Sequence, residues 1–237
     1  MLWPREESVA AGNRTHRKHK LLAIDSLNPN SWTNAEEYLK HTAADLALVQ
    51  ETKIPATAKN ETESTIRRNG WRMAISACGK GPLGGNSAGV AVGCRNHIGM
   101  REAHPDFGVP ELEQRLTIKK VDCAARGGLN LGSCYLVSGI GISAPQNLDL
   151  LHCLVGMLKR ISGPWIIGGD FNGTPEELVA NGWLKLVGGK IHRPVMPTCG
   201  ERCLDFFVVS ACITDDIDGV KLVADNTFSP ITRSVFT

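Results

Sequence analysis

The 237-residue chain lacks the segments that mark membrane and secreted proteins. Residues 1–20 contain no apolar stretch of the kind that forms the centre of a secretory signal. No apolar run approaches the roughly 20 residues that a helix needs to cross a bilayer. We therefore expect an intracellular protein with no membrane partner, and these absences do not distinguish the nucleus from the cytoplasm.

The chain also lacks a large excess of charge. Its 26 lysines and arginines nearly balance 24 acidic residues, so no strong basic field indicates nucleic acid. The exception is a short basic run over residues 14–20, which could contact phosphates or act as a nuclear signal, although a solvated tail is the more common interpretation. We expect residues 1–20 to form a flexible basic arm and residues 21–237 to form one domain.

Two kinds of cofactor motif are missing as well. The eight cysteines fall mostly in apolar patterns, where a free thiol behaves as a small hydrophobic group. Cys199 and Cys203 flank three residues, but no second cysteine or histidine pair with zinc spacing follows, so we expect no structural zinc. The absence of a Gly-x-Gly-x-x-Gly or Walker-type loop makes a nucleotide cofactor fold less favoured.

The hydrophobic pattern predicts a mixture of strands and helices. Strands are expected over residues 21–25, 46–50, 71–77, 88–94, 114–123, 130–137, 165–169, 203–209, 219–224 and 230–236. Helices are expected over residues 34–42, 58–69 and 145–161, and from Pro175 onward. Arg115, at the start of a strand, is expected to lie on the surface, with a phosphate contact as the alternative. This order, in which paired strands alternate with single helices, fits an α/β (α+β) protein with two packed sheets and helices outside them.

The most informative segment spans residues 164–175. An apolar strand pattern ends there in two glycines, and Asp170 and Asn172 follow, two residues apart. Because alternate residues of an extended chain point the same way, we expect the carboxylate and the amide to leave the sheet together. Such a pair suits a hydrated divalent metal or a phosphate ester, and a simple Asp/Asn turn is the alternative.

Polar residues also occur where other predicted strands end. Asn28 and Asn30 follow the first strand, Glu51 follows the second, and Tyr135 closes a predicted hairpin. Asp205 lies inside an otherwise apolar strand, where a carboxylate is costly unless it is paired or bound to a metal. The asparagines could equally form a turn, and the tyrosine could be a core aromatic.

Together these segments resemble the endonuclease/exonuclease/phosphatase superfamily, which includes DNase I, exonuclease III-type abasic-site endonucleases and retrotransposon endonuclease domains. Residues 48–53 read Leu-Val-Gln-Glu-Thr-Lys and match the family's Leu-Gln-Glu-Thr-Lys motif, and residues 169–172 match Gly-Asp-Phe-Asn. Residues 204–207 are similar to the family's Leu-Asp-Tyr-Phe strand, and residues 28–30 match its opening Asn-x-Asn/Asp motif. The resemblance covers about residues 21–237 and implies a DNase I-like, four-layer α/β/β/α sandwich.

The resemblance also implies an activity and a cofactor. It indicates a divalent-metal-dependent phosphodiester hydrolase, of endonuclease type, with nucleic acid as its partner. Glu51 and Asn30 are the implied ligands of Mg²⁺ or Mn²⁺. No protein partner is inferred.

The same resemblance implies roles for the other polar residues. Asp170 orients or activates the attacking water, and Asn172 and Asn28 contact the phosphate. Tyr135 corresponds to a tyrosine near the scissile phosphate. Asp205 corresponds to an acid that orients a catalytic histidine.

One part of the chain departs from the family pattern. The family ends in Ser-Asp-His-x-Pro, whereas residues 226–230 here read Asn-Thr-Phe-Ser-Pro and place Phe228 where the histidine stands. Phenylalanine can neither transfer a proton nor hydrogen-bond a phosphate. The alternative is therefore a catalytically impaired member of the superfamily that acts as a nucleic-acid- or protein-binding module.

Overall fold

The computed structural model describes residues 21–81, 83–103, 110–223 and 231–236. The expected basic arm over residues 1–20 and the departure at Phe228 therefore lie outside the described residues. None of the helices in these ranges has the length and hydrophobicity that a bilayer-spanning segment requires.

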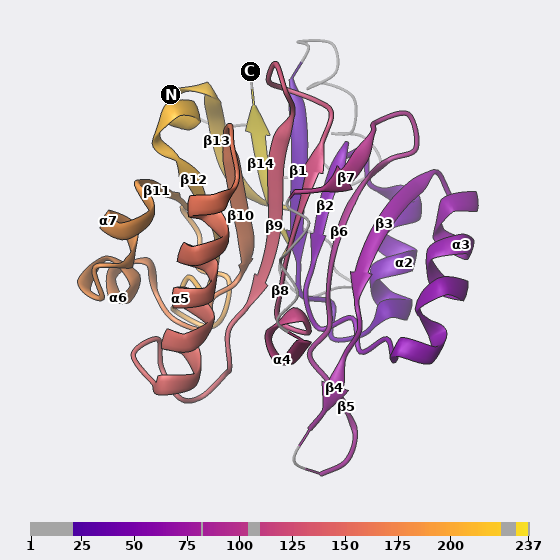
Figure 1. Cartoon of the computed structure of the whole chain (residues 1–237), viewed down its shortest axis with the longest axis horizontal. Helices are drawn as coiled ribbons and strands as arrows, with labels where there is room; N and C mark the ends of the chain where they lie inside the picture. Colours follow the sequence, from indigo (N-terminus) through magenta and orange to yellow (C-terminus); the bar gives the residue numbers. More distant parts are fainter. Residues whose placement is uncertain (1–20, 82, 104–109, 224–230, 237) are drawn as a thin grey trace.

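Two six-stranded sheets pack face to face (Figure 1). The first sheet contains, in spatial order, β13 (Ile217–Val223), β14 (Ile231–Phe236), β1 (Leu22–Leu27), β2 (Leu46–Val49), β6 (Val90–Arg95) and β3 (Trp71–Ser76). The second contains β11 (Gly189–His192), β12 (Asp205–Ser210), β10 (Trp165–Asp170), β9 (Leu129–Tyr135), β8 (Leu116–Val121) and β7 (Met100–Glu102). A small hairpin of β4 (Gly79–Lys80) and β5 (Asn86–Ser87) projects from one end of the molecule.

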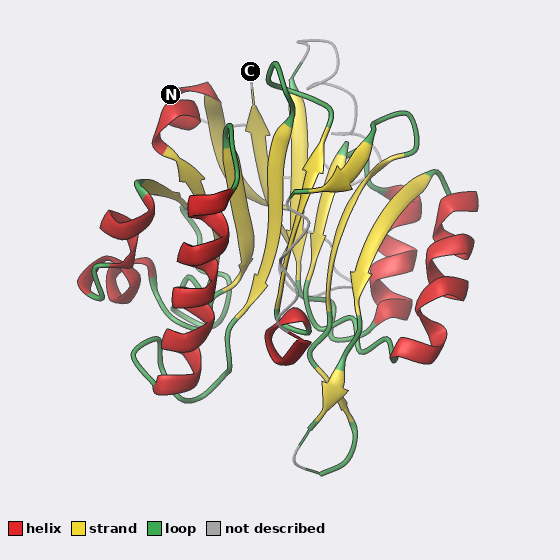
Figure 2. Ribbon diagram, in the orientation of Figure 1, coloured by secondary structure: helices red, strands yellow, loops and turns green. Residues whose placement is uncertain are grey.

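Helices cover the outer face of each sheet (Figure 2). Those beside the first sheet are α2 (Trp32–His41) and α3 (Lys59–Arg68), and those beside the second are α5 (Pro145–Arg160), α6 (Pro175–Ala180) and α7 (Trp183–Val187). The remaining helical turns are η1 (Ala56–Ala58), α4 (Pro110–Glu113) and η2 (Ala211–Asp216). The expected four-layer α/β/β/α sandwich is confirmed.

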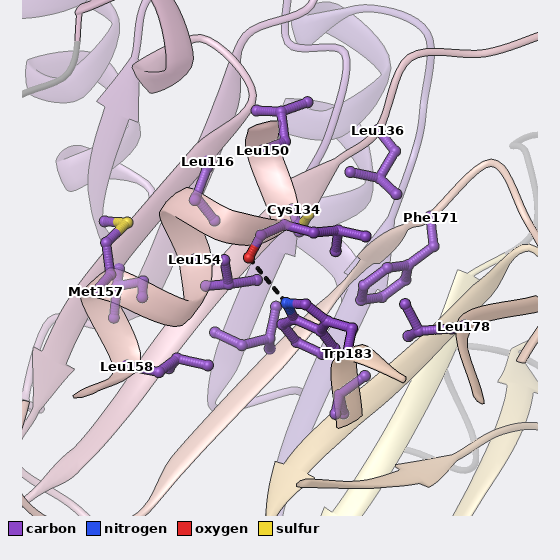
Figure 3. Packing of buried hydrophobic residues seen from close by; sticks show 14 of the residues in the cluster. Leu116, Cys134, Leu136, Leu150, Leu154, Met157, Leu158, Phe171, Leu178 and Trp183 are labelled. Atoms are coloured by element: carbon purple, nitrogen blue, oxygen red, sulfur yellow. Dashed lines mark hydrogen bonds between the residues drawn. The ribbon is translucent and has the colours of Figure 1, made fainter. Parts of the chain in front are cut away.

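Strand periodicity explains the three apolar layers of this sandwich. Alternate residues of a strand face opposite sides of the sheet, so Ile166 packs between the two sheets while Ile167 packs beneath the helices. Ile24 and Ala23 divide in the same way in the first sheet. Figure 3 shows the layer beneath α5, where the Nε1 of the buried Trp183 donates a 2.8 Å hydrogen bond to the backbone oxygen of Leu151.

The structure corrects several expected elements. The helix expected from residue 34 begins at Trp32, because Ser31 is its N-cap and accepts a 3.4 Å hydrogen bond from the Asn34 N–H. The sequence pattern also missed β7, β11 and α7, which contain only three to five residues each. Elements this short contain too few residues to show a period in the sequence.

A buried ion pair holds β14 against β1. Asp25 and Arg233 are register partners, and the guanidinium meets the carboxylate through Nε–Oδ1 and Nη2–Oδ2 contacts of 2.6 and 2.9 Å. The hydroxyls of Tyr38 and Thr42 donate to the same carboxylate at 2.7 and 2.6 Å. Burial by itself raises the pKa of Asp25, but Arg233 and the two hydroxyls together lower it below its ordinary value.

Removing one member of this pair is expected to be costly. Arg233→Met leaves the Asp25 carboxylate buried without its cation, which should lower the free energy of unfolding by about 3–5 kcal/mol. Urea denaturation measures this loss. Arg101→Met, which removes an exposed ion pair with Asp122, is the control and should cost less than about 1 kcal/mol. Equal losses of unfolding free energy in the two variants would show that the buried ion pair stabilises the fold no more than the exposed one.

Candidate active site

Three polar side chains form a row across the second sheet. Asp170, the last residue of β10, is the register partner of Tyr135 at the end of β9 and of Asp205 at the start of β12. Because alternate residues of a strand face the same side, all three side chains lie on the same face of the sheet as Ile166 and Phe207, which pack between the two sheets. The row therefore lies where the apolar layer between the sheets ends.

The first sheet contributes two further side chains to this end of the sandwich. Asn28 follows β1 and Glu51 follows the parallel strand β2, so both leave the sheet at the same edge. The Asn28 Nδ2 donates to Asp170 Oδ2 at 3.0 Å, and the Tyr135 hydroxyl donates to the Glu51 carboxylate. We call the region formed by Asn28, Glu51, Tyr135, Asp170 and Asp205 the mouth.

Asp170 and Asn172 come together differently from the sequence expectation. They do not lie in one extended segment, because Asn172 has a left-handed backbone with φ of 47°. Its N–H donates to Asp170 Oδ1 at 2.9 Å, and its Nδ2 donates to the backbone oxygen of Leu136 at 2.8 Å. The turn thus orients the Asp170 carboxylate. The following helix α6 is capped by Thr174, as its sequence position suggests.

Four of the six described non-glycine residues with left-handed backbone belong to the mouth or lie two residues from one of its members. Asn30, Glu51, Lys53 and Asn172 have φ values of 60°, 51°, 54° and 47°. Main-chain hydrogen bonds of 3.0 Å from residues 52 and 53 to residues 88 and 89 hold the Glu51 segment in place. Such conformations are uncommon away from glycine and cluster where a site must hold a particular geometry.

Burial shapes the charge of the two aspartates. It raises the pKa of Asp170, assisted by the nearby Glu51 carboxylate and opposed by hydrogen bonds from two neutral N–H groups. Burial, followed by the charge of Asp170, raises the pKa of Asp205 to about 8, while a hydrogen bond from the Thr198 hydroxyl opposes the shift. The pair therefore retains a proton at a higher pH than a solvated aspartate does.

Two further residues lie beside the site, one that the sequence favoured as a surface residue and one that the sequence did not identify. The guanidinium of Arg115, expected on the surface, is half-buried with its carbon 5.0 Å from the ring centroid of Tyr135. Burial and the bond to Glu51 raise the pKa of Tyr135, and Arg115 opposes that shift. The hydroxyl of Thr198 accepts from the N–H groups of residues 204 and 205 at 2.9 and 3.0 Å. No sequence pattern pointed to Thr198, because its loop position shows no period.

The oxygen atoms at the mouth suit a hard divalent cation. Mg²⁺ is usually held through one or two carboxylates and keeps several waters. The Glu51 carboxylate at the mouth offers such a ligand, whereas Asn30 is an exposed residue whose N–H donates to Asn28 Oδ1 at 3.4 Å. The Nζ of Lys53 lies 3.9 Å from Glu51 Oε2 and is partly exposed. The described ranges contain no cluster of three or more His, Cys, Asp or Glu side chains able to hold a metal.

Solved structures share this architecture at low sequence identity. The 3′ phosphatase NExo from Neisseria, in a structure bound to a product DNA hairpin, matches with a TM-score of 0.64 and 16% identity over 91% of this chain and 99% of that one. The AP endonuclease LMAP from Leishmania major matches with a TM-score of 0.62 and 14% identity, over 91% of this chain and 87% of that one. The endonuclease domain of TRAS1, a telomere-specific non-LTR retrotransposon, matches with a TM-score of 0.60 and 17% identity, over 91% of this chain and 98% of that one. These likenesses show a common fold.

Sequence comparison supplies the family. No curated protein sequence matches the chain significantly. The model of the Endonuclease/Exonuclease/phosphatase family matches residues 28–217, which is most of the chain. The two-sheet sandwich and its polar mouth agree with that match, and the chain belongs to the endonuclease/exonuclease/phosphatase family.

Proposed function

We propose that this chain is a divalent-metal-dependent phosphodiesterase that cleaves nucleic acid. The proposal depends on one observation, which is that Glu51 of the first sheet and Asp170 of the second lie at the same mouth. Tyr135 bridges them, because it bonds to Glu51 and is the register partner of Asp170. Family membership supports phosphodiester chemistry, and the similar structures, which include one bound to a DNA hairpin and two of endonucleases, support nucleic acid as the substrate.

Glu51 and Asn30 would hold the metal ion. When bound there, Mg²⁺ or Mn²⁺ polarises the phosphoryl oxygen and lowers the pKa of water. The hydrogen bond from Tyr135 fixes the orientation of the Glu51 carboxylate. This hydrogen bond keeps the ligand oxygens in place before the substrate arrives.

Asp170 is the proposed acceptor of a proton from the attacking water. Asn28 and the backbone N–H of Asn172 hold its carboxylate by bonds of 3.0 and 2.9 Å. Each asparagine amide has two N–H groups, and within the described part of the chain only one of each is bonded. The second N–H of Asn28 and of Asn172 is suited to a phosphate oxygen, and Tyr135 is the register partner of Asp170, to which both asparagines are bonded.

The sequence at Phe228 favours a second candidate, a module that binds nucleic acid without cleaving it. In this candidate the mouth still contacts phosphate, but no turnover occurs. Binding without cleavage of plasmid, abasic duplex and single-stranded substrates, in Mg²⁺ and in Mn²⁺, is the outcome that would favour this candidate.

Removing the Glu51 charge should abolish metal-dependent cleavage. Glu51→Gln loses a carboxylate ligand, so kcat should fall by about 100-fold or more, since such metal contacts contribute several kcal/mol. Mn²⁺ binding, followed by electron paramagnetic resonance, should weaken in parallel. Glu37→Gln, on the exposed face of α2, is the matched control. Cleavage that persists in EDTA would contradict the proposed metal dependence.

Removing the Asn28 amide should change the acid side of the pH–rate profile. Its N–H stabilises ionised Asp170, so Asn28→Ala raises the pKa of that carboxylate. The rate should then begin to fall at a pH about one unit higher, because a hydrogen bond to a charged group contributes about 1.5–3 kcal/mol. Asn69→Ala, which removes an exposed amide bonded to Glu36, should leave the profile unchanged. If the acid side of the pH–rate profile does not shift in Asn28→Ala, Asn28 does not stabilise the ionised Asp170 carboxylate.

A further inference from the structure

Asp170 and Asp205 stand directly opposite each other in the antiparallel pair of β10 and β12. Side chains at such positions share one face, with Cβ atoms about 4.5–5.5 Å apart, and like charges placed there repel. Asp205 is only 6% exposed. The two carboxyl groups therefore adjoin each other in a place where water screens them poorly.

The groups bonded to this pair are neutral. Asp170 accepts hydrogen bonds from Asn28 and from the N–H of Asn172, and Asp205 is bonded to Thr198. Among the described residues, no histidine, lysine or arginine contributes to the pKa of either aspartate.

Several basic side chains on the described elements around Asp205 are bonded to other residues. On the loop that follows β11, Arg193 and Arg202 are exposed and pair with glutamates 176 and 177 of α6. On β14, Arg233 is paired with Asp25. In β11 the ring of His192 bonds to a threonine hydroxyl of η2. The neighbouring thiol of Cys203 stays protonated, because burial raises its pKa to about 11.

We propose that Asp170 and Asp205 form a carboxyl–carboxylate dyad that holds one proton at neutral pH. The proton resides on Asp205, which is the more buried acid and has one hydroxyl partner. The negative charge resides on Asp170, which has two N–H donors. Asp205 is thus a positioning residue that acts through Asp170, in a chain whose sequence has Phe228 at the expected histidine position.

The catalytic consequence rests on the proposed function. As the water oxygen bonds to phosphorus and the bond from phosphorus to the leaving oxygen breaks, the water proton passes to Asp170. The dyad then holds two protons and returns one to solvent, while the leaving oxygen takes a proton from solvent. One water is consumed for each ester cleaved, and the dyad returns to its singly protonated state.

Asp205→Asn tests the dyad, because asparagine resembles the protonated acid. In the wild type, the rate should fall above pH about 8, where Asp205 ionises and a second charge adjoins Asp170. In Asp205→Asn this alkaline fall should disappear, with kcat at pH 7 reduced by less than about 10-fold. Asp218→Asn, on the exposed edge strand β13, should retain the wild-type profile. A loss of 100-fold or more across the whole pH range would show that Asp205 works ionised, and would overturn the proposal.

An infrared measurement separates the dyad from the proposed function. The carbonyl stretching band of a protonated carboxyl should be present in the wild type at pH 7 and absent in Asp205→Asn. This band does not depend on cleavage, so it tests the dyad even if no nucleic acid is hydrolysed. Its absence from the wild type at pH 7 would overturn the dyad, whereas an inactive wild type that shows the band would overturn only the proposed phosphodiesterase.

The pH dependence of stability is a second measurement of the dyad that does not depend on cleavage. Asp205 keeps its proton in the folded state up to pH about 8 but loses it near pH 4 when unfolded. Wild-type stability should therefore fall as the pH rises between these values, relative to Asp205→Asn. Urea denaturation of both variants and of Asp218→Asn measures the difference. A difference that does not change with pH would contradict a protonated Asp205.

Discussion

The site depends on where the apolar layer between the two sheets ends. Strand alternation places Tyr135, Asp170 and Asp205 on the inner face of the second sheet, in the first row beyond that layer. The sheets approach closely just behind the row, because a Cβ on Gly168 would lie 2.7 Å from the Leu48 side chain. This close approach allows Asn28 and Glu51 of one sheet to reach side chains of the other.

The molecule holds buried carboxylates in two different ways. Asp25 faces Arg233 and two hydroxyls, so its charge is neutralised and its pKa is lowered. In the part of the chain that the structure describes, the hydrogen-bond donors to Asp170 and Asp205 are neutral and the charges that act on them are carboxylates, so burial raises both pKa values. The first arrangement fixes a strand, and the second leaves reactive acids at the edge of the core. Uncompensated buried charge is costly, and such perturbed acids are typical of functional sites.

Much of the fold was predictable because its signals are local. Buried strands are visible as apolar runs, α5 shows a clear helical period, and the order of elements indicated two sheets with helices outside. The motif residues were predictable because acids and amides at the ends of apolar strands are unusual. The predicted start of α2 at residue 34 was wrong, because Ser31 caps the helix and Trp32 is its first residue. The sequence favoured an exposed Arg115, whereas the residue is half-buried, because it packs on Tyr135 of a neighbouring strand.

By itself, the sequence determined the layered architecture and the residue types available for chemistry, because strand and helix periods are properties of short segments. Only the tertiary structure decided which acids adjoin. The facing of Asp170 and Asp205 depends on the register of β10 against β12, and the bond from Asn28 to Asp170 depends on how closely the two sheets pack. Register and sheet separation arise from contacts between residues far apart in the chain, so no local pattern records them.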